Sequence, residues 1–350
     1  DEAHRSVGDY AYTSIATSFS SNVLFLAMTA TLPSDKKKAD EIVKSLRINS
    51  VLQKTDESSD VKPYIQETKT EWINVELPLD MKAVQFSETG GPEVLQYIDV
   101  PDPTPGPDEV LVRVKSIGVN YTDVMTRSGL NHNINMSPLP SILGVEASGI
   151  VVETGSKVTE ISSGESVAYY ANNSRSYAEL AVVPSWRAIR LPVGVSFDDA
   201  AATIVQGMTA QHLCHTTHRV QKGEIILIHA AAGGVGLLLT QMVKESGATV
   251  IGTVSTEAKA AAARNAGADE VIIYTQQDFV TEVKRVTKGA GVNVVYDSVG
   301  ISTFEGSIES LARKGHMVIY GQASGPVPPV PLSNLYDKSL TLSRTNLLDY

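Results

Sequence analysis

The stretch Ile225-Ile226-Leu227-Ile228-His229-Ala230-Ala231-Ala232-Gly233-Gly234-Val235-Gly236-Leu237 decides the fold. A strand-like apolar run leads into small residues, and these lead into a segment of helical period. The spacing Ala231-x-Gly233-x-x-Gly236 is the dinucleotide-binding fingerprint with alanine in its first position. Small residues let the backbone approach a pyrophosphate, and the helix start offers unpaired N–H groups to the anion. We therefore predict a strand, a turn and a helix that bind a dinucleotide; the alternative is a turn needed only for packing.

The alternation of predicted strands and helices continues along the chain. Strand-like and helix-like segments alternate from about Ser196 to Tyr320. The expected strands are Glu224–His229, Thr249–Val254, Val271–Tyr274, Val292–Tyr296 and His316–Tyr320, and the expected helices are Leu237–Ser246 and Glu257–Ala266. Between Lys82 and about Val195 the apolar runs are short and broken by turns. The pattern predicts an α/β chain in which a β-rich domain precedes a parallel sheet covered by helices.

The end of the second strand bears on which dinucleotide binds. An NAD enzyme carries a ribose-binding acid near Ser255, but no carboxylate stands there, and Lys259 follows. A missing anion beside a cation suits the 2′-phosphate of NADP, although Glu257 lies between the two residues. The alternative is that Lys259 is only a solvated helix residue.

Two blocks resemble the zinc-binding blocks of medium-chain alcohol dehydrogenases, but without the ligands. These blocks are Gly118–Asp123 and Leu143–Glu146. Asn120, Tyr121 and Val145 occupy positions where those enzymes place Cys and His. Catalytic zinc needs about three ligands from Cys, His or carboxylates. We therefore predict that no metal is bound there.

Ordered segments after Met81 carry a wider resemblance. They are Met81–Val84, Gly90–Leu95, Gly118–Asn120, Arg127–Leu130, Gln206–Ala210, His229–Gly236, Tyr296–Gly300 and Gly315–Gly321. On these segments residues 81–350 resemble the zinc-free quinone oxidoreductases, the zeta-crystallin-like branch of the medium-chain dehydrogenase/reductase superfamily. The resemblance implies a GroES-like substrate domain over 81–205, a doubly wound Rossmann domain over 206–335, and the start of a return to the substrate domain over 336–350. It also implies NADPH, a homodimer, and a quinone or enone substrate.

The resemblance implies roles for individual residues. Asn120 and its neighbour Tyr121 are the candidates at the reacting end of the site, although Asn120 also suits a turn. The expected cofactor-binding residues are Ala231, Gly233, Gly234, Val235 and Gly236 at the pyrophosphate, Ser255, Lys259 and Tyr274 at the 2′-phosphate, and Thr209 and Gly321 near the nicotinamide. For Tyr274, the alternative is an ordinary tyrosine at a strand end.

Three departures from the family pattern concern the substrate. Met125 and Asn131 stand where family members often carry tyrosines that line the quinone pocket. The chain also ends at Tyr350, before the family's usual end, and the part beyond normally completes the substrate domain. The identity of the acceptor therefore stays open.

Residues 1–80 differ in character, being rich in Ser, Thr, Asp and Lys. Asp1-Glu2-Ala3-His4 is a DEAH box, and Met28–Thr31 and Asp60–Tyr64 resemble segments of Hef/Fanconi-M-type repair helicases. This resemblance implies a partial α/β helicase-like segment. The chain has no Gly-x-x-x-x-Gly-Lys-[Ser/Thr] loop to cradle ATP phosphates. We interpret 1–80 as an incomplete helicase fragment joined to a second protein.

Other polar groups are better explained by structure than by chemistry. His212, His215 and His218 fall at helical spacing around Cys214, and no carboxylate lies in that run. We favour packing over metal binding for the histidines and an inert, buried thiol for Cys214. Ser196 is expected to cap a helix that carries Asp199 in its first turn.

Composition limits the remaining functions of the 350-residue chain. A net charge of −10 makes nucleic acid an unlikely partner, and the longest strongly apolar stretch, Val23–Met28, is far too short to span a membrane. A single cysteine and an acidic start favour a reducing cytoplasm. We predict an NADPH-dependent, zinc-free oxidoreductase acting on a quinone or an activated alkene. The alternatives are an enoyl or alkenal reductase of the same fold, a non-catalytic NADPH-binding protein, and, least favoured, a helicase-derived nucleic-acid ATPase.

Overall fold

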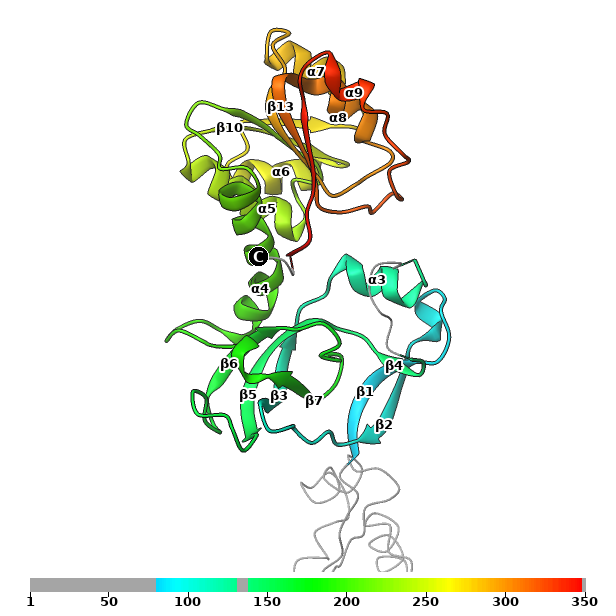
Figure 1. Ribbon diagram of the computed structural model, residues 1–350, viewed down its shortest axis with the longest axis vertical. Coiled ribbons are helices and arrows are strands. Elements are labelled where there is room, and N and C mark those ends of the chain that lie inside the picture. The colour runs from blue at the N-terminus through cyan, green and yellow to red at the C-terminus, as the bar shows by residue number, and fades with distance from the viewer. Residues whose placement is uncertain (1–79, 131–137, 348–350) are drawn as a thin grey trace, which may run out of the picture. The chain divides into compact units, whose positions relative to one another are not determined.

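The computed structural model describes residues 80–130 and 138–347 of the chain (Figure 1). The DEAH box, the other helicase-like segments and Asn131 lie outside the described residues. Among the helices that the structure describes, none is long and apolar enough to cross a membrane.

The first part of the described chain contains two sheets. A three-stranded sheet has the order β2-β1-β4, and a five-stranded antiparallel sheet has the order β7-β3-β5-β6-β8. The strands are β1 (Asp80–Phe86), β2 (Gln96–Pro101), β3 (Glu109–Ile117), β4 (Ser141–Ile142), β5 (Glu146–Thr154), β6 (Ser166–Tyr170), β7 (Leu180–Pro184) and β8 (Ala188–Arg190). Val112, Val151 and Tyr169 come from neighbouring strands of the five-stranded sheet and pack in one core. The expectation of a β-rich first domain is confirmed.

Short helices connect these strands. α3 (Tyr121–Arg127) follows β3, while η2 (Pro92–Val94) and η3 (Ser185–Arg187) are single 3-10 turns. Asn120 is the N-cap residue of α3, with Asp123 in the first turn, so a sequence position suggested for chemistry also starts a helix.

A six-stranded parallel sheet forms the second part of the described chain. Its order is β11-β10-β9-β12-β13-β14, and every neighbouring pair is parallel. The elements are β9 (Ile225–Ile228), α5 (Gly234–Glu245), β10 (Thr249–Val254), α6 (Glu257–Asn265), β11 (Glu270–Ile273), α7 (Phe279–Val286), β12 (Val292–Asp297), α8 (Phe304–Ser310), β13 (Leu311–Ile319), α9 (Ser333–Tyr336) and β14 (Thr341–Arg344). Counted from β9, this is the 3-2-1-4-5-6 order of a Rossmann domain, whose ligand site lies at the switch between its first and fourth strands.

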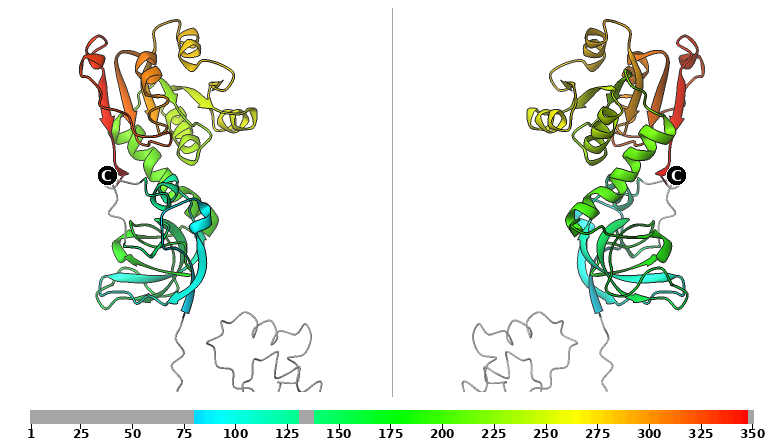
Figure 2. Two further views of the ribbon diagram at one scale, coloured as in Figure 1. Left: turned by 90° about the vertical axis from the view of Figure 1, so that its right-hand side faces the viewer. Right: turned by 90° about the vertical axis from the view of Figure 1, so that its left-hand side faces the viewer.

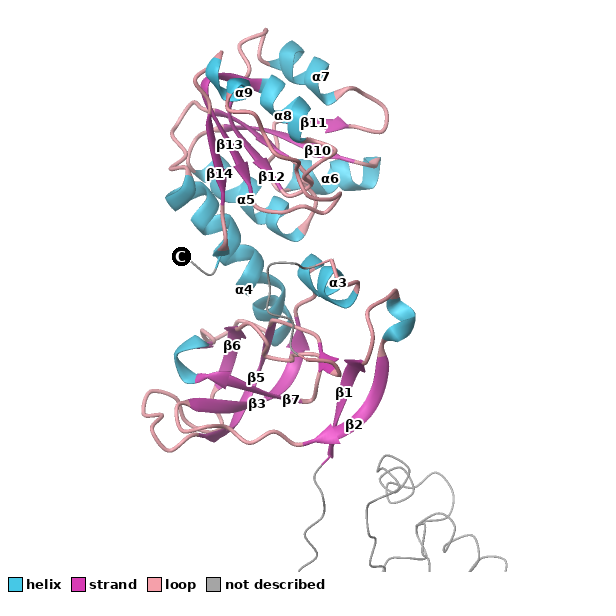
Figure 3. Cartoon of the chain, turned by 45° about the vertical axis from the view of Figure 1, so that its right-hand side comes forward, coloured by secondary structure: helices cyan, strands magenta, loops and turns pink. Residues whose placement is uncertain are grey.

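The central strand β9 is buried on both faces. Ile226 and Ile228 pack in a core with Leu239 of α5, whereas Leu227 packs in a second core with Phe304 of α8. Figure 3 shows α5 and α6 on one side of the sheet and α7 and α8 on the other. A strand covered on both faces reads as a continuous apolar run, which is why the sequence predicted β9 well.

α4 (Phe197–His212) lies between the two sheets in the sequence and continues into the π-helical segment η4 (Leu213–Thr217). The backbone N–H of Asp199 donates to the Ser196 side chain, so the predicted cap is confirmed. The domain boundary expected after residue 205 therefore falls inside a continuous helix.

The last strand differs from the expectation. Residues 336–350 were expected to begin a return to the substrate domain, but β14 pairs with β13 in parallel, with Val318 opposite Ser343. Figures 1 and 2 show β14 in red beside the orange β13, at an edge of the parallel sheet. Backbone pairing along an open sheet edge decided this placement; Leu340 and Leu342 alternate with polar residues, but that alternation does not say which sheet the strand joins.

Candidate functional site

The glycine-rich turn between β9 and α5 is closed by its own backbone. The Gly233 N–H donates to the Ala230 carbonyl at 2.8 Å, and Gly233, the N-cap residue of α5, supplies no side-chain cap. A Cβ added to Gly236 would lie 2.4 Å from the same carbonyl oxygen. The start of the helix therefore packs directly on the turn, and its first N–H groups are left for an anion.

A cavity of about 490 Å³ opens beside this turn. Four of the expected cofactor residues line it together: Gly233, Ser255, Lys259 and Tyr274. The lining residues that the sequence did not single out include His229, Thr253, Gln277, Asp278, Phe279 and Ser302. They lie at or just beyond the carboxyl ends of β9, β10, β11 and β12, which is where an open parallel sheet binds its ligands.

Lys259 and Ser255 form a polar pair in this cavity. The Lys259 Nζ donates to the Ser255 Oγ at 3.1 Å, and the Thr256 side chain caps α6 by accepting from the Lys259 N–H. Asp278 also lines the cavity, but its carboxylate accepts from the N–H and hydroxyl of Thr281, at 2.8 and 2.6 Å, as the cap of α7. Lys259 therefore offers a ligand phosphate a cation at the end of β10, while the Asp278 carboxylate is held by the start of α7.

The other expected cofactor residues lie elsewhere. Ala231 is fully buried beneath the turn, and Val235 packs against the core that contains Leu239. The Thr209 hydroxyl donates to the Val205 carbonyl at 2.7 Å within α4. A Cβ on Gly321 would lie 2.6 Å from the Ser298 carbonyl oxygen, so that glycine permits a close backbone approach.

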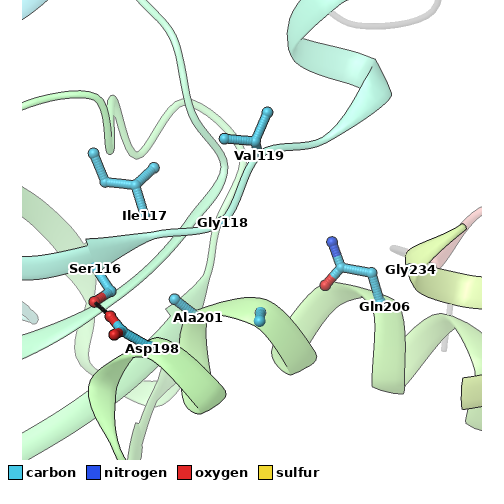
Figure 4. Close-up of a pocket in the computed structure, with 9 residues that line it drawn as sticks. Ser116, Ile117, Gly118, Val119, Asp198, Ala201, Gln206 and Gly234 are labelled. Atoms are coloured by element: carbon cyan, nitrogen blue, oxygen red, sulfur yellow. Dashed lines mark hydrogen bonds between the residues drawn. The ribbon is translucent and has the colours of Figure 1, made fainter.

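Gly234 and the segment before Asn120 line a second cavity of about 320 Å³ (Figure 4). The residues that line it are Ser116, Ile117, Gly118, Val119, Asp198, Ala201, Ala202, Gln206 and Gly234. Ser116 donates a hydrogen bond to Asp198, which Figure 4 shows as a dashed line. This cavity therefore joins β3, α4 and the first residue of α5.

Both ends of the Asn120 carboxamide are hydrogen-bonded. Its Nδ2 donates to Glu146 Oε1 at 2.6 Å, and its Oδ1 accepts from Gln206 Nε2 at 3.1 Å. Tyr121, the other residue expected at the reacting end, is 54% exposed, and its hydroxyl donates to the Ala323 carbonyl at 2.8 Å. The two neighbouring residues therefore take part in separate contacts.

Glu146 belongs to the site, although no role was assigned to it from the sequence. Its side chain is fully buried on β5, and the second carboxylate oxygen accepts from the Val205 N–H at 2.8 Å. Burial raises the pKa of Glu146, against the hydrogen bonds it accepts from Val205, Asn120 and Gln206, and nearby Asp123 raises it further. The available signal was a carboxylate directly before a run of small and apolar residues, Ala147 to Val152.

Asp123 is a second buried carboxylate near Asn120. It accepts from the Asn120 N–H at 2.9 Å and from the Tyr177 hydroxyl at 3.2 Å. Burial raises the pKa of Asp123 from its ordinary value. Both carboxylates are hydrogen-bonded to Asn120, which was expected at the reacting end of the site, and perturbed acids of this kind gather at functional sites.

The raised pKa of Glu146 predicts how Glu146→Gln changes stability with pH. The folded chain holds the Glu146 proton to a higher pH than the unfolded chain, which releases it near the ordinary value of 4.5. The unfolding free energy of the native chain, relative to that of E146Q, therefore falls as pH rises above 4.5 towards the raised pKa. Urea unfolding of both proteins across this range measures the difference, and a difference that rises with pH would contradict the assignment.

Asp297 organises the wall of the larger cavity from the end of β12. Its Oδ1 accepts from the backbone N–H groups of Val299 and Gly300 at 2.7 and 3.1 Å, and its Oδ2 accepts from the Thr303 hydroxyl at 2.7 Å. His229 sits beside this network, with Nε2 2.9 Å from the Ser307 hydroxyl. Desolvation in the core lowers the pKa of His229, which favours the neutral ring.

Comparison with known proteins places this geometry in a family. The model for the alcohol dehydrogenase GroES-like domain matches residues 106–193, and the model for the zinc-binding dehydrogenase matches 234–349. A quinone oxidoreductase of Pseudomonas aeruginosa is 44% identical over 270 residues, which cover 77% of this chain and 82% of the relative. A 2-haloacrylate reductase of a Burkholderia species is 40% identical over 71% of this chain and 75% of its own length.

A solved structure agrees with these matches. The Escherichia coli quinone oxidoreductase complexed with NADPH superimposes with a TM-score of 0.73 at 41% identity, covering 77% of this chain and 82% of that one. The chain belongs to the quinone oxidoreductase family.

One of the two matching family models describes zinc-binding dehydrogenases, so the positions of possible zinc ligands in this quinone oxidoreductase family member need to be compared with it. Asn120 and Val145 stand in the blocks where zinc ligands were considered. Within residues 80–130 and 138–347, no group of three or more His, Cys, Asp or Glu side chains is arranged to hold a metal ion.

The histidine run around Cys214 is divided between different contacts. His218 lies 3.1 Å from a carboxylate oxygen of Glu224, a residue just beyond the run, and 3.3 Å from His316, so a carboxylate outside the run does reach one histidine. His212 lies 3.4 Å from the Thr345 hydroxyl. Cys214 is buried in the core, and desolvation raises the pKa of its thiol to about 11, as expected for an unreactive side chain.

Proposed function

We propose that this chain is an NADPH-dependent oxidoreductase that transfers reducing equivalents to a quinone or an activated alkene. The observation that supports this most strongly is the cavity beside the glycine-rich turn, where Lys259 and Ser255 replace the acid of an NAD site. The chain's relatives include quinone oxidoreductases, one of them solved with NADPH, and a 2-haloacrylate reductase. When bound, NADPH supplies the hydride, and the protein supplies binding and orientation.

In this proposal each part of the site has a distinct task. The turn from Ala231 to Gly236 receives the pyrophosphate, since Gly236 lets the start of α5 pack on the Ala230 carbonyl and the first N–H groups of the helix can bind an anion. Lys259, Ser255 and Tyr274, which line the cavity beside this turn, receive the 2′-phosphate. Asn120 donates from its carboxamide to a carbonyl oxygen of the acceptor. The expected roles of Tyr121 at the reacting end and of Thr209 and Gly321 near the nicotinamide stay predictions.

Steady-state turnover tests the proposal. NADPH absorbance is followed with p-benzoquinone, methyl vinyl ketone or 2-chloroacrylate as the acceptor, against blanks without protein. Protein-dependent consumption with the quinone supports a quinone reductase, and consumption with only the alkenes supports the enoyl or alkenal alternative. NADPH binding seen by fluorescence without turnover of any acceptor supports the non-catalytic alternative, and a folded chain that does not bind NADPH overturns the proposal.

Lys259→Ala is expected to raise the Kd for NADPH about tenfold while leaving the Kd for NADH almost unchanged. An exposed cation contributes a charge-assisted hydrogen bond to the 2′-phosphate, and NADH has no such group. Fluorescence titration with both nucleotides measures the two constants. Lys157→Ala removes an exposed lysine that pairs with Asp108 in the β-rich domain, and it serves as the matched control. Equal weakening of both nucleotides by K259A would show that Lys259 does not contact the phosphate.

Three further proposals concern the oligomeric state, the location and residues 1–80.

We propose that the chain forms a homodimer, and sedimentation equilibrium of the full chain tests this. We propose a cytoplasmic location, which fractionation of the source cells tests. The interpretation of residues 1–80 as a helicase fragment predicts no ATP hydrolysis, since the chain lacks a phosphate-binding loop.

A further inference from the structure

Glu146 is a buried carboxylate whose hydrogen bonds converge on Asn120. One oxygen, Oε1, accepts from Asn120 Nδ2 at 2.6 Å and from Gln206 Nε2 at 3.2 Å, and the other accepts from the Val205 N–H. Residues 120, 146 and 206 belong to the start of α3, to β5 and to α4. A carboxylate on a core strand thus ties the start of α3 to the middle of α4.

This arrangement permits one orientation of the Asn120 carboxamide. An ionised carboxylate only accepts hydrogen bonds, so it selects the NH₂ end of the amide. Gln206 offers Nε2 to the Asn120 Oδ1 at 3.1 Å, which selects the carbonyl end from the other side. If the Asn120 amide were flipped, its oxygen would face the Glu146 carboxylate and its NH₂ group would face the donating Gln206 Nε2. In the selected orientation Nδ2 keeps a second N–H besides the one that it donates to Glu146.

Close packing leaves the two supporting side chains little freedom. A Cβ on Gly118 would lie 2.2 Å from Glu146 Oε1, so the carboxylate rests directly on a glycine of the segment leading to Asn120. A Cβ on Gly234 would lie 2.9 Å from the Gln206 Cγ, so Gln206 packs on the first residue of α5. Figure 4 shows Gln206 between the Gly118 segment and Gly234. The support of Asn120 therefore touches the glycine-rich turn.

We propose that Glu146 and Gln206 are positioning residues that hold the Asn120 carboxamide in one orientation for reduction of a carbonyl acceptor. This inference rests on the proposed function of Asn120. Neither residue touches the acceptor; each acts through Asn120. Because a small misplacement of a group at a reacting centre has large kinetic effects, the consequence is expected in kcat more than in the KM for NADPH.

A double-mutant cycle tests the proposal in the full-length protein. E146Q and N120A are each expected to lower kcat with NADPH and p-benzoquinone by about 10²-fold, and the double variant is expected to be no slower than N120A. E165Q removes a carboxylate that pairs with Arg190 at the surface of the same domain, and it is expected to keep kcat within about twofold. Independent, multiplying effects of E146Q and N120A would overturn the proposal.

A second measurement does not depend on turnover. In protein labelled with ¹⁵N-asparagine, the signal lost in N120A identifies the Asn120 side-chain amide. E146Q and Gly118→Ala are expected to shift that signal, while E165Q leaves it in place. An unmoved Asn120 signal in E146Q would overturn the positioning role. If the native chain fails to oxidise NADPH but the signal moves, the proposed function fails and the orientation of Asn120 by Glu146 stands.

Discussion

Gly236→Ala is expected to weaken NADPH binding at least about tenfold and to lower the free energy of unfolding by about 3 kcal/mol. The added Cβ would lie 2.4 Å from the Ala230 carbonyl oxygen and 2.8 Å from Ala231 backbone atoms. These are main-chain atoms, so no change of rotamer relieves the overlap, and α5 must move away from the turn. Fluorescence titration with NADPH and urea unfolding measure the two effects.

Gly207→Ala provides the matched control for a glycine within a helix. Its Cβ would meet only the Leu238 Cδ1, at an ordinary 4.0 Å. Alanine is favoured over glycine inside a helix by about 0.5–1 kcal/mol, so G207A is expected to keep or increase stability. If G236A bound NADPH as tightly as G207A, the glycine-rich turn would not be the pyrophosphate site.

Asp297→Ala is expected to lower the free energy of unfolding by about 3–5 kcal/mol and to weaken NADPH binding. The fully buried carboxylate accepts from two backbone N–H groups, those of Val299 and Gly300, and from the Thr303 hydroxyl. Alanine would leave these donors without an acceptor in the interior. Because Val299 and Thr303 also line the larger cavity, the loss should extend to the ligand. Urea unfolding and NADPH titration measure the two losses.

Asp297→Asn separates the loss of hydrogen bonds from the loss of charge. The asparagine oxygen can accept from the Val299 and Gly300 N–H groups, and the hydroxyl of Thr303 can turn to accept from the new amide. We expect a loss of about 1 kcal/mol and NADPH affinity close to that of the native chain. Equal losses in D297N and D297A would mean that charge, rather than acceptor geometry, holds the segment.

Local sequence patterns were sufficient to predict most strands and helices of the parallel sheet domain. The expected strand Thr249–Val254 has the observed limits of β10, and the expected helix Glu257–Ala266 differs from α6 by one residue at its end. Strands covered on both faces read as unbroken apolar runs, and glycines and capping residues mark their ends. The glycine-rich turn and the Ser255–Lys259 pair were found for the same reason, since each lies within a few residues along the chain.

The polar network at Asn120 could not be predicted from local sequence patterns. The hydrogen bond from Asn120 to Glu146 joins positions 26 residues apart, and the one from Gln206 to Asn120 joins positions 86 apart. Each residue alone suits a bland role, as a helix cap, a strand carboxylate or a polar helix residue. Only the packing of α4 against β5 shows that they share hydrogen bonds.

The sequence by itself therefore indicated the parallel sheet, the turn that suits a diphosphate, and the Ser255–Lys259 pair that suits a phosphorylated ribose, since these depend on residue size and charge within single βα units. The tertiary structure alone decided that β14 extends the sheet, that Asp297 holds the cavity wall, and that Glu146 orients Asn120. These three depend on backbone pairing and on hydrogen bonds of buried polar groups between separate segments of the chain, and the sequence of one segment does not identify its partner.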